Sequence, residues 1–108
     1  MKNIVILISG SGSNMAAIVR TAQRDNWRKL YGAQVAAVIS NRPDAEGLAL
    51  AREHLVATDV VDHKRYDSRE AFDEALARVI DTRQPALVVL AGFMRILTPG
   101  FVARYAGR

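Results

Sequence analysis

A short turn rich in glycine and serine, Gly10-Ser-Gly-Ser-Asn14, is the stretch best suited to chemistry. It separates an apolar, β-branched run (residues 4–8) from a stretch with helical periodicity, which predicts a strand, a tight turn and a helix. Gly10 and Gly12 allow positive φ and a close approach of ligand to backbone, and Ser13 and Asn14 are expected to cap the helix. Unpaired N–H groups at such a helix start attract anions. The turn therefore predicts a phosphate-binding site, and the alternative is a plain turn without a ligand.

Two better-known nucleotide-binding patterns do not fit this turn. A dinucleotide fingerprint would need a glycine where Met15 stands, and an acidic residue for a ribose hydroxyl after the second strand, which ends Val38-Ile-Ser-Asn-Arg42. A P-loop would need Gly-Lys-Ser/Thr, which does not follow the turn. The pattern therefore indicates phosphate, without indicating a dinucleotide.

The composition restricts the class of protein. Half of the 108 residues are hydrophobic, enough for the core of one domain, 1–108, without an internal boundary. The absence of cysteine excludes disulfides, thiolate metal sites and thiol catalysis. The net charge of +4 comes from scattered lysines and arginines, which favours an acidic small molecule over nucleic acid. No apolar run is long enough for a signal-peptide core or a bilayer span, so we expect a cytoplasmic protein with no membrane partner and no metal.

Strand and helix patterns alternate along the chain. Strands are predicted at residues 4–8, 35–39, 58–61 and 87–91, and helices at 15–22, 44–54, 67–80 and 98–105. Asp44, Asp67 and Thr98 are expected to cap the last three helices. Residues 24–31 are predicted to be a polar connection in which Trp27 and Leu30 pack back on the body.

This alternation predicts an α/β fold, a Rossmann-like parallel sheet with helices on both faces. Crossovers are right-handed by rule, and we expect strand order 3-2-1-4. Ligands of such sheets bind beyond the carboxyl ends of the strands, near the switch between the first and fourth strands. The two loops expected to meet there are residues 9–14 and 92–97.

The two loops resemble those of the phosphoribosylglycinamide formyltransferases of purine biosynthesis. The matching stretches are Ile8-Ser-Gly-Ser-Gly-Ser-Asn14, Val88-Val-Leu-Ala-Gly-Phe-Met-Arg-Ile-Leu97, Ile39-Ser-Asn-Arg-Pro-Asp-Ala45, Asp67-Ser-Arg-Glu70 and Tyr105-Ala-Gly-Arg108. The resemblance covers nearly the whole chain. It implies the formyltransferase fold and transfer of a formyl group from the co-substrate 10-formyltetrahydrofolate to glycinamide ribonucleotide.

The resemblance also implies roles for individual residues. Gly12, Ser13 and Asn14 would hold the substrate phosphate through backbone N–H groups and side chains. The folate site would be formed by Arg69, Leu90, Met94, Arg95, Ile96 and Leu97. Leu90 would pack against the pterin, and Arg69 would face the acidic tail of the folate. The alternatives are a solvated first-turn arginine for Arg69 and ordinary core packing for the apolar members.

One departure from the family concerns the end of the second predicted helix. Leu55 stands where the family commonly has a glycine. A left-handed cap at a residue other than glycine costs on the order of 1 kcal/mol, so we expect an irregular helix end there.

A second departure concerns catalysis. By resemblance, an Asn-x-His-Pro strand and a later aspartate stabilise the oxyanion and manage the protons of the amine, and the sequence contains neither. His54 and His63 do not occupy matching positions and are predicted to lie on the surface. We therefore expect an N-terminal substrate-binding fragment that has no catalytic residue, ends after the fourth strand and its helix, and is inactive alone. Its partner would be the missing C-terminal segment, and its exposed sheet edge could self-associate. The alternatives are a stand-alone phosphate- or nucleotide-binding module and one half of a split enzyme.

Overall fold

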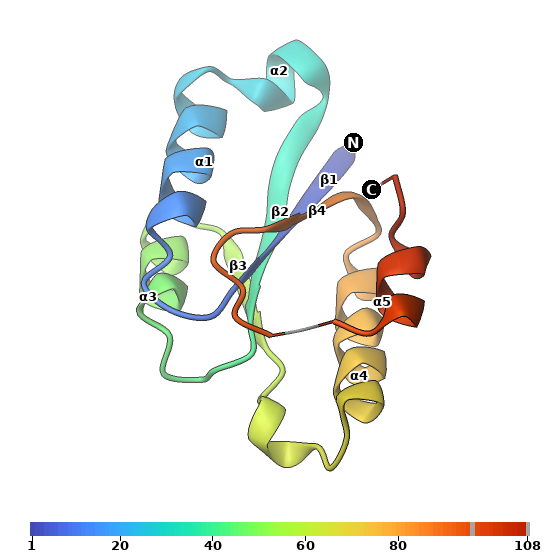
Figure 1. Ribbon diagram of the computed structural model, residues 1–108. Helices are drawn as coiled ribbons and strands as arrows, with labels where there is room; N and C mark the ends of the chain where they lie inside the picture. Colours follow the sequence, from blue (N-terminus) through green and yellow to red (C-terminus); the bar gives the residue numbers. More distant parts are fainter. Residues whose placement is uncertain (96, 108) are drawn as a thin grey trace.

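The computed structural model describes residues 1–95 and 97–107 and places a parallel four-stranded sheet between two layers of helices (Figure 1). The elements are β1 (Lys2–Ile8), α1 (Ser13–Arg24), α2 (Trp27–Tyr31), β2 (Ala33–Ser40), α3 (Glu46–Glu53), β3 (Ala57–Val60), the 3₁₀ helix η1 (His63–Arg65), α4 (Arg69–Thr82), β4 (Pro85–Leu90) and α5 (Pro99–Arg104). The strand order is β3-β2-β1-β4, which confirms the predicted order 3-2-1-4.

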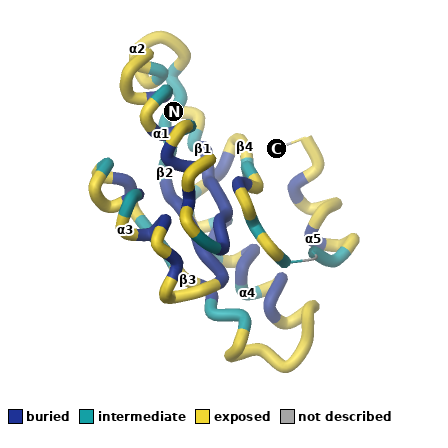
Figure 2. Tube along the Cα trace, turned by 60° about the vertical axis from the view of Figure 1, so that its left-hand side comes forward, coloured by how far each residue is buried: buried dark blue, intermediate teal, exposed yellow. Residues whose placement is uncertain are grey.

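β1 is the centre of the sheet because its side chains are apolar on both faces. Ile4, Ile6 and Ile8 pack in the layer that contains α1 and α3, whereas Val5 and Leu7 pack in the layer that contains α4 and α5. This two-sided burial is typical of a central parallel strand. Figure 2 shows the buried residues gathered along β1 and β2, with exposed residues toward the outside. The carboxyl end of this buried central strand thus leads directly into the predicted phosphate-binding turn.

β4 is an edge strand of the described sheet, and its surface is unusually apolar. The strand reads Pro85-Ala-Leu-Val-Val-Leu90 and pairs with β1 on one side. Leu87 and Leu90 are 43% and 55% exposed. An exposed apolar edge of this kind offers free backbone groups to another strand.

The main difference from the predicted elements lies between β1 and β2. Residues 27–31 form the short helix α2 instead of a polar connection, bracketed by left-handed residues at Asn26 (φ 51°) and Gly32 (φ 62°). Trp27 is half-buried and packs on the core as predicted. Leu30 is exposed, so the prediction that it packs back was wrong. With no buried residue, this single turn lacks the apolar periodicity by which a helix can be predicted.

The helix caps differ from the predictions by one or two residues at three of four positions. Gly12 is the N-cap of α1, with φ 74° and no side-chain hydrogen bond, so Ser13 and Asn14 are its first helical residues. α3 is preceded by Ala45 instead of Asp44, whose carboxylate accepts from Arg42 Nη2 at 3.1 Å. The ion pair with Arg42 therefore replaces the expected cap.

The two remaining N-caps precede α4 and α5. The N-cap of α4 is Ser68 instead of Asp67, and its Oγ accepts from Ala71 N at 3.0 Å. Thr98 caps α5 as predicted, with Oγ1 accepting from Phe101 N at 3.2 Å. Adjacent acceptors such as Asp67 and Ser68 are both good N-caps, so composition cannot decide between them.

The end of α3 retains a left-handed cap although no glycine is present. Leu55 has φ 63°, and Val56 N donates to Ala51 O at 2.9 Å. The side chain of Leu55 is 94% exposed. The expected irregularity is thus confined to an unfavourable φ at Leu55, while the hydrogen bonds that close the helix are made.

Candidate active site

The two loops predicted to meet do lie side by side at the carboxyl ends of β1 and β4. Ala91 N donates to Leu7 O at 2.9 Å, which extends the β4–β1 pairing up to the loops. Met94 N donates to Ser9 Oγ at 2.7 Å. A cavity of about 230 Å³ lies between the loops and is lined by Gly10, Ser11, Gly12, Ser13, Asn14, Ala91, Gly92 and Met94. The predicted phosphate turn and the start of the predicted folate loop therefore share one cavity.

The start of α1 leaves backbone donors open in this cavity. Gly12 O accepts from Ala16 N at 2.8 Å, and no side chain caps the helix. The N–H groups of the first helical residues have no intrahelical acceptor, as at any helix start. Ser13 and Asn14 are exposed beside them. The turn thus presents backbone and side-chain donors to an anion.

Gly47, in the first turn of α3, contacts the predicted phosphate turn (residues 10–14) and holds its backbone in place. Its N–H donates to Gly10 O at 3.0 Å, and a Cβ added to Gly12 would lie 2.7 Å from Gly47 Cα. A Cβ at Gly47 would in turn lie 2.5 Å from Ile8 Cδ1. Sequence reasoning missed Gly47, and the available signal was a glycine inside a helix, where it is otherwise unfavourable.

The residues of the predicted folate loop divide into two groups. Met94 is 82% exposed at the cavity, and Leu90 is exposed at the end of β4. Leu97 and Phe93 pack against the core under α4 and α5, so the core-packing alternative describes Leu97 well. Ile96 lies outside the described residues.

The two predicted arginines differ in their surroundings. The Arg95 guanidinium lies over the Phe72 ring, with Cζ 4.7 Å from the ring centroid, and this stacking holds its side chain against α4. Arg69 is the first residue of α4 and is exposed. It lines none of the three described cavities that contain residues of the 9–14 turn, so no described cavity joins it to the other predicted site residues.

A buried polar network, absent from the sequence predictions, lies beneath the loops. Ser9 Oγ donates to Asn41 Oδ1 at 2.7 Å and accepts from Met94 N. His63 Nδ1 lies 2.9 Å from Asn41 O and 3.4 Å from Asn41 Nδ2, and His63 N donates to Asn41 O at 3.2 Å. His63 and His54, both predicted to lie on the surface, are half-buried. The hydrogen bond to Asn41 is a long-range contact that no local pattern reveals.

The same network forms the floor of a second cavity of about 420 Å³, which also contains basic side chains. Its lining residues are Ser9, Gly10, Asn41, Arg42, His63, Lys64, Met94 and Arg95. The hydrogen bond from Arg42, followed by its positive charge, lowers the pKa of the nearby Asp44 carboxyl below its usual value. The ionised Asp44 carboxylate offsets the charge of Arg42, but Lys64 and Arg95 also line this cavity and none of its described lining residues is acidic. This lining suits an anionic ligand.

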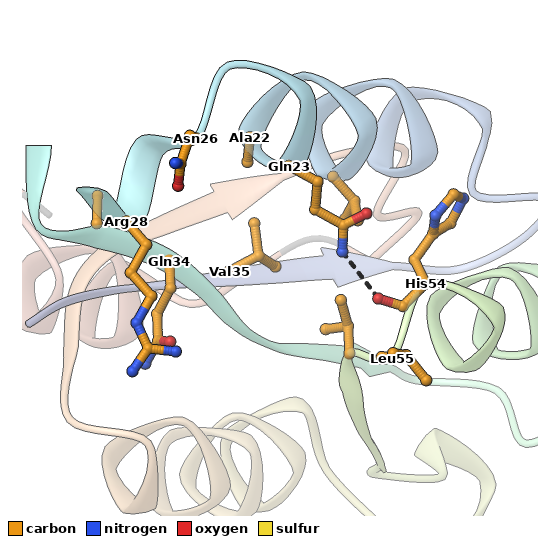
Figure 3. Close-up of a pocket in the computed structure, with 11 residues that line it drawn as sticks. Ala22, Gln23, Asn26, Arg28, Gln34, Val35, His54 and Leu55 are labelled. Atoms are coloured by element: carbon orange, nitrogen blue, oxygen red, sulfur yellow. Dashed lines mark hydrogen bonds between the residues drawn. The ribbon is translucent and has the colours of Figure 1, made fainter. Parts of the chain in front are cut away.

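A further cavity, of about 400 Å³, lies at the opposite end of the molecule, near the start of β2 (Figure 3). Apolar side chains such as Val35 form part of its lining, and Gln23 Nε2 donates to His54 O at 2.8 Å across it. It contains none of the predicted ligand residues. The predicted site and this cavity are thus separate features.

Across residues 1–95 and 97–107, no helix is long and apolar enough to cross a membrane. The same part of the chain holds no cluster of three or more His, Cys, Asp or Glu side chains that could bind a metal ion.

The chain matches a known protein family over nearly its whole length. The formyl transferase family matches residues 2–108. The chain belongs to the formyl transferase family. Since the match extends over both loops and all strands, the alternative of a stand-alone phosphate- or nucleotide-binding module is not favoured.

The relatives within the formyl transferase family are purine enzymes. The chain is 51% identical over 106 residues to the phosphoribosylglycinamide formyltransferase of Escherichia coli K12, covering 98% of this chain and 48% of the relative. It is 38% identical over 105 residues to the trifunctional purine biosynthetic protein adenosine-3 of Gallus gallus, covering 97% of this chain and 10% of that relative. The chain thus spans about half the length of its bacterial relative.

Solved structures of the family have the same fold. The phosphoribosylglycinamide formyltransferase of Coxiella burnetii superposes with a TM-score of 0.88 at 43% identity, over 99% of this chain and 48% of that one. The enzyme of Brucella melitensis superposes with a TM-score of 0.89 at 40% identity, over 99% of this chain and 54% of that one. These matches confirm the predicted formyltransferase fold.

Proposed function

We propose that this chain forms the substrate-binding part of a phosphoribosylglycinamide formyltransferase. In this proposal a formyl group passes from 10-formyltetrahydrofolate to the amine of glycinamide ribonucleotide. The observation that carries the proposal is the shared cavity, in which the open helix start at Gly12 to Asn14 faces Gly92 and Met94. The relatives in Escherichia coli and Coxiella burnetii bear this enzyme's name, which supports the same assignment.

The two loops perform distinct tasks in the proposed reaction. Gly12, Ser13 and Asn14 bind the phosphate of glycinamide ribonucleotide, and Met94, Arg95 and Leu97 form one wall of the folate site, with Leu90 beside the pterin. A flat heterocycle is well accommodated by backbone groups and aliphatic side chains. Fixing both substrates in one cavity converts an encounter of two molecules into a reaction within a complex, which is a large part of catalysis.

The chemical step needs groups beyond those in the shared cavity. Attack of the amine on the formyl carbon creates a tetrahedral oxyanion, which requires a hydrogen-bond donor and a group that accepts the amine proton. The described residues lining the cavity carry no titratable side chain. We propose that a segment corresponding to the other half of the bacterial relatives supplies these groups, and that it docks on the exposed edge of β4.

Binding of the phosphate can be tested directly by nuclear magnetic resonance. Inorganic phosphate and glycinamide ribonucleotide are titrated separately into isotope-labelled protein, and backbone amide shifts are followed. We expect the largest shifts at residues 11–15 for both ligands. Asn14→Ala should weaken binding, whereas Gln23→Ala, at the other end of the same helix, should not. Largest shifts elsewhere would contradict the phosphate assignment.

Activity is tested by formyl transfer to glycinamide ribonucleotide. The chain is assayed alone and after addition of the C-terminal half of the Escherichia coli relative. We expect activity only in the mixture, because proton transfer and oxyanion stabilisation each typically contribute about 10² or more in rate. Full activity of the chain alone would show that the groups for the chemical step lie within it.

A further inference from the structure

The loop that follows β4 is held at both ends by buried side chains that lie outside it. Near its start, Met94 N donates to Ser9 Oγ at 2.7 Å, and at its end Thr98 N donates to Asp73 Oδ2 at 2.6 Å. Ser9 is 3% exposed and Asp73 is 4% exposed. Figure 1 shows the start of this loop, in orange, leaving β4 at the carboxyl end of the sheet. Two acceptors far apart in sequence thus fix the two ends of one loop.

The Ser9 hydroxyl can hold Met94 because Asn41 orients it. A hydroxyl has one proton to donate, and Ser9 gives that proton to Asn41 Oδ1 at 2.7 Å. Its lone pairs are then directed to other donors, of which Met94 N is one. Asn41 follows β2 directly, and its backbone carbonyl accepts from His63 N. The start of the loop is thereby tied to the ends of β1 and β2 as well as to β4.

The burial of the Asp73 carboxylate does not favour folding. Asp73 lies in α4 beside a cavity that Glu70 and Arg104 also line, and its Oδ1 is buried without a hydrogen-bond partner among the described residues. A buried, unpaired carboxylate oxygen is unfavourable, so such a group calls for an explanation. The only described hydrogen bond of this side chain is the one that Oδ2 accepts from Thr98 N.

The position of Asp73 also relates to Arg95. Its neighbour Phe72 is the residue over whose ring the Arg95 guanidinium lies. α4 therefore contacts the loop through two successive residues. Asp73 accepts from Thr98 N at the end of the loop, and the Phe72 ring supports the side chain of Arg95 in the loop. A change in the loop's position would disturb both contacts.

We propose that Ser9, Asn41 and Asp73 are positioning residues that set the geometry of the folate-binding loop. They act through Met94 and Thr98 without contacting the folate themselves. The proposal rests on the proposed function for its ligand, but the two-ended clamp itself is a property of this chain. Loss of either clamp releases the loop and weakens folate binding, while the phosphate turn, which is braced separately by Gly47, keeps its affinity.

The clamp is tested first without any ligand, by amide hydrogen exchange in the chain. Ser9→Ala should increase the exchange rate of Met94 N–H by about tenfold or more, as expected for loss of one buried hydrogen bond. Ser40→Ala is the matched control, because Ser40 is also buried and its Oγ accepts a backbone N–H, that of Arg42, at 3.1 Å. The control should leave Met94 N–H unchanged. Unchanged exchange of Met94 N–H in Ser9→Ala would overturn the clamp.

The second clamp is tested with a conservative pair of variants. Asp73→Ala removes the acceptor and should increase the exchange of Thr98 N–H, whereas Asp73→Asn keeps an Oδ1 acceptor and should restore most of the protection. The Kd for 10-formyltetrahydrofolate should rise about tenfold in Asp73→Ala and Ser9→Ala and stay near the wild-type value in Asp73→Asn and Ser40→Ala. The Kd for inorganic phosphate should remain unchanged in all four.

The outcomes separate the clamp from the proposed function. Faster exchange with an unchanged folate Kd would overturn the positioning role. A wild-type chain that is completed with the C-terminal half of the Escherichia coli relative and still does not bind 10-formyltetrahydrofolate would overturn the proposed function. The exchange data would in that case still decide whether the loop is clamped.

Discussion

Gly12 and Gly47 approach each other so closely that neither has room for a side chain. A Cβ on Gly12 would lie 2.7 Å from Gly47 Cα, and a Cβ on Gly47 would lie 3.0 Å from Gly12 Cα. The approach brings the start of α3 against the start of α1, and Gly47 N donates to Gly10 O in the same contact. The shape of the turn at residues 10–14 is therefore set by α3, which follows it by thirty-odd residues.

Gly12→Ala is expected to destabilise the protein and abolish phosphate binding. Ala would be strained at φ 74°, and its Cβ would meet backbone atoms that cannot rotate away. We expect a loss of about 1–3 kcal/mol in the free energy of unfolding, measured by urea denaturation. Gly100→Ala, at an open helical position, is the control and should be neutral or slightly stabilising. Equal stabilities of the two variants would contradict this account of the turn.

Met94 and Leu97 are expected to separate folate binding from folding. Met94→Asp places a charge on an exposed wall of the cavity, so it should weaken folate binding with little change in the free energy of unfolding. Leu97→Ala should destabilise the fold by about 1–3 kcal/mol because Leu97 packs against the core. Leu97→Asp should weaken folate binding and also lower the free energy of unfolding, because it disturbs both the folate site and the core packing. The measurements are folate titration and urea denaturation. A Met94→Asp variant with unchanged folate affinity would argue against the proposed site.

The Arg42–Asp44 pair is expected to produce a small pH dependence. The hydrogen bond from Arg42 lowers the pKa of Asp44 in the folded protein, so the contribution of this carboxylate to stability is present above its unfolded pKa. It is lost as the pH falls through the lower folded pKa, which places the change below about pH 4. Arg42→Gln should raise the pKa of Asp44 toward its usual value, as followed by carboxyl NMR titration. Arg28→Gln, at an exposed arginine on α2, should leave it unchanged, and the same value in all three proteins would refute the pairing.

Leu87→Lys is expected to suppress self-association of the chain. Leu87 is 43% exposed on the β4 edge strand, and charges on such edges prevent pairing with another copy. We expect sedimentation to show dimers or larger species at high concentration for the wild type, and monomers for Leu87→Lys. Leu30→Lys changes an exposed leucine on α2, away from this edge, and should leave the self-association in place. If both variants associate as the wild type does, another surface is responsible.

The sequence predicts the features of this protein that depend on local patterns. Apolar runs such as residues 4–8 predict the strands, their alternation with helices predicts a parallel sheet covered on both faces, and the Gly-Ser turn locates the open helix start. The helix α2 escaped prediction because none of its residues is buried, so burial leaves no periodic pattern there. Ser68 and Asp67 are equivalent as caps in composition, and the choice between them depends on the entry angle of the chain.

The parts of the site that could not be predicted depend on contacts between distant residues. Ser9 reads locally as one more serine of a turn, yet it is buried between Asn41 and Met94. Asp73 belongs to a helix whose pattern predicts only an apolar face and a polar face. Its contact with Thr98 follows from the packing of α4 beside α5. The sequence shows the chemical type of each side chain, but it does not show which distant residue that side chain contacts.

The placement of β1 between β2 and β4 bears on the order in which the protein acquires its site. Ser9 and Met94 are 85 residues apart, and Asn3 and Arg83, joined at the opposite end of the sheet, are 80 residues apart. Each contact closes a loop of most of the chain, whose entropy must be lost before the contact contributes. During synthesis β1 emerges first, and its second neighbour, β4, emerges only after β2, β3 and α4. The cavity between the two loops therefore forms only after β4 has emerged and docked beside β1.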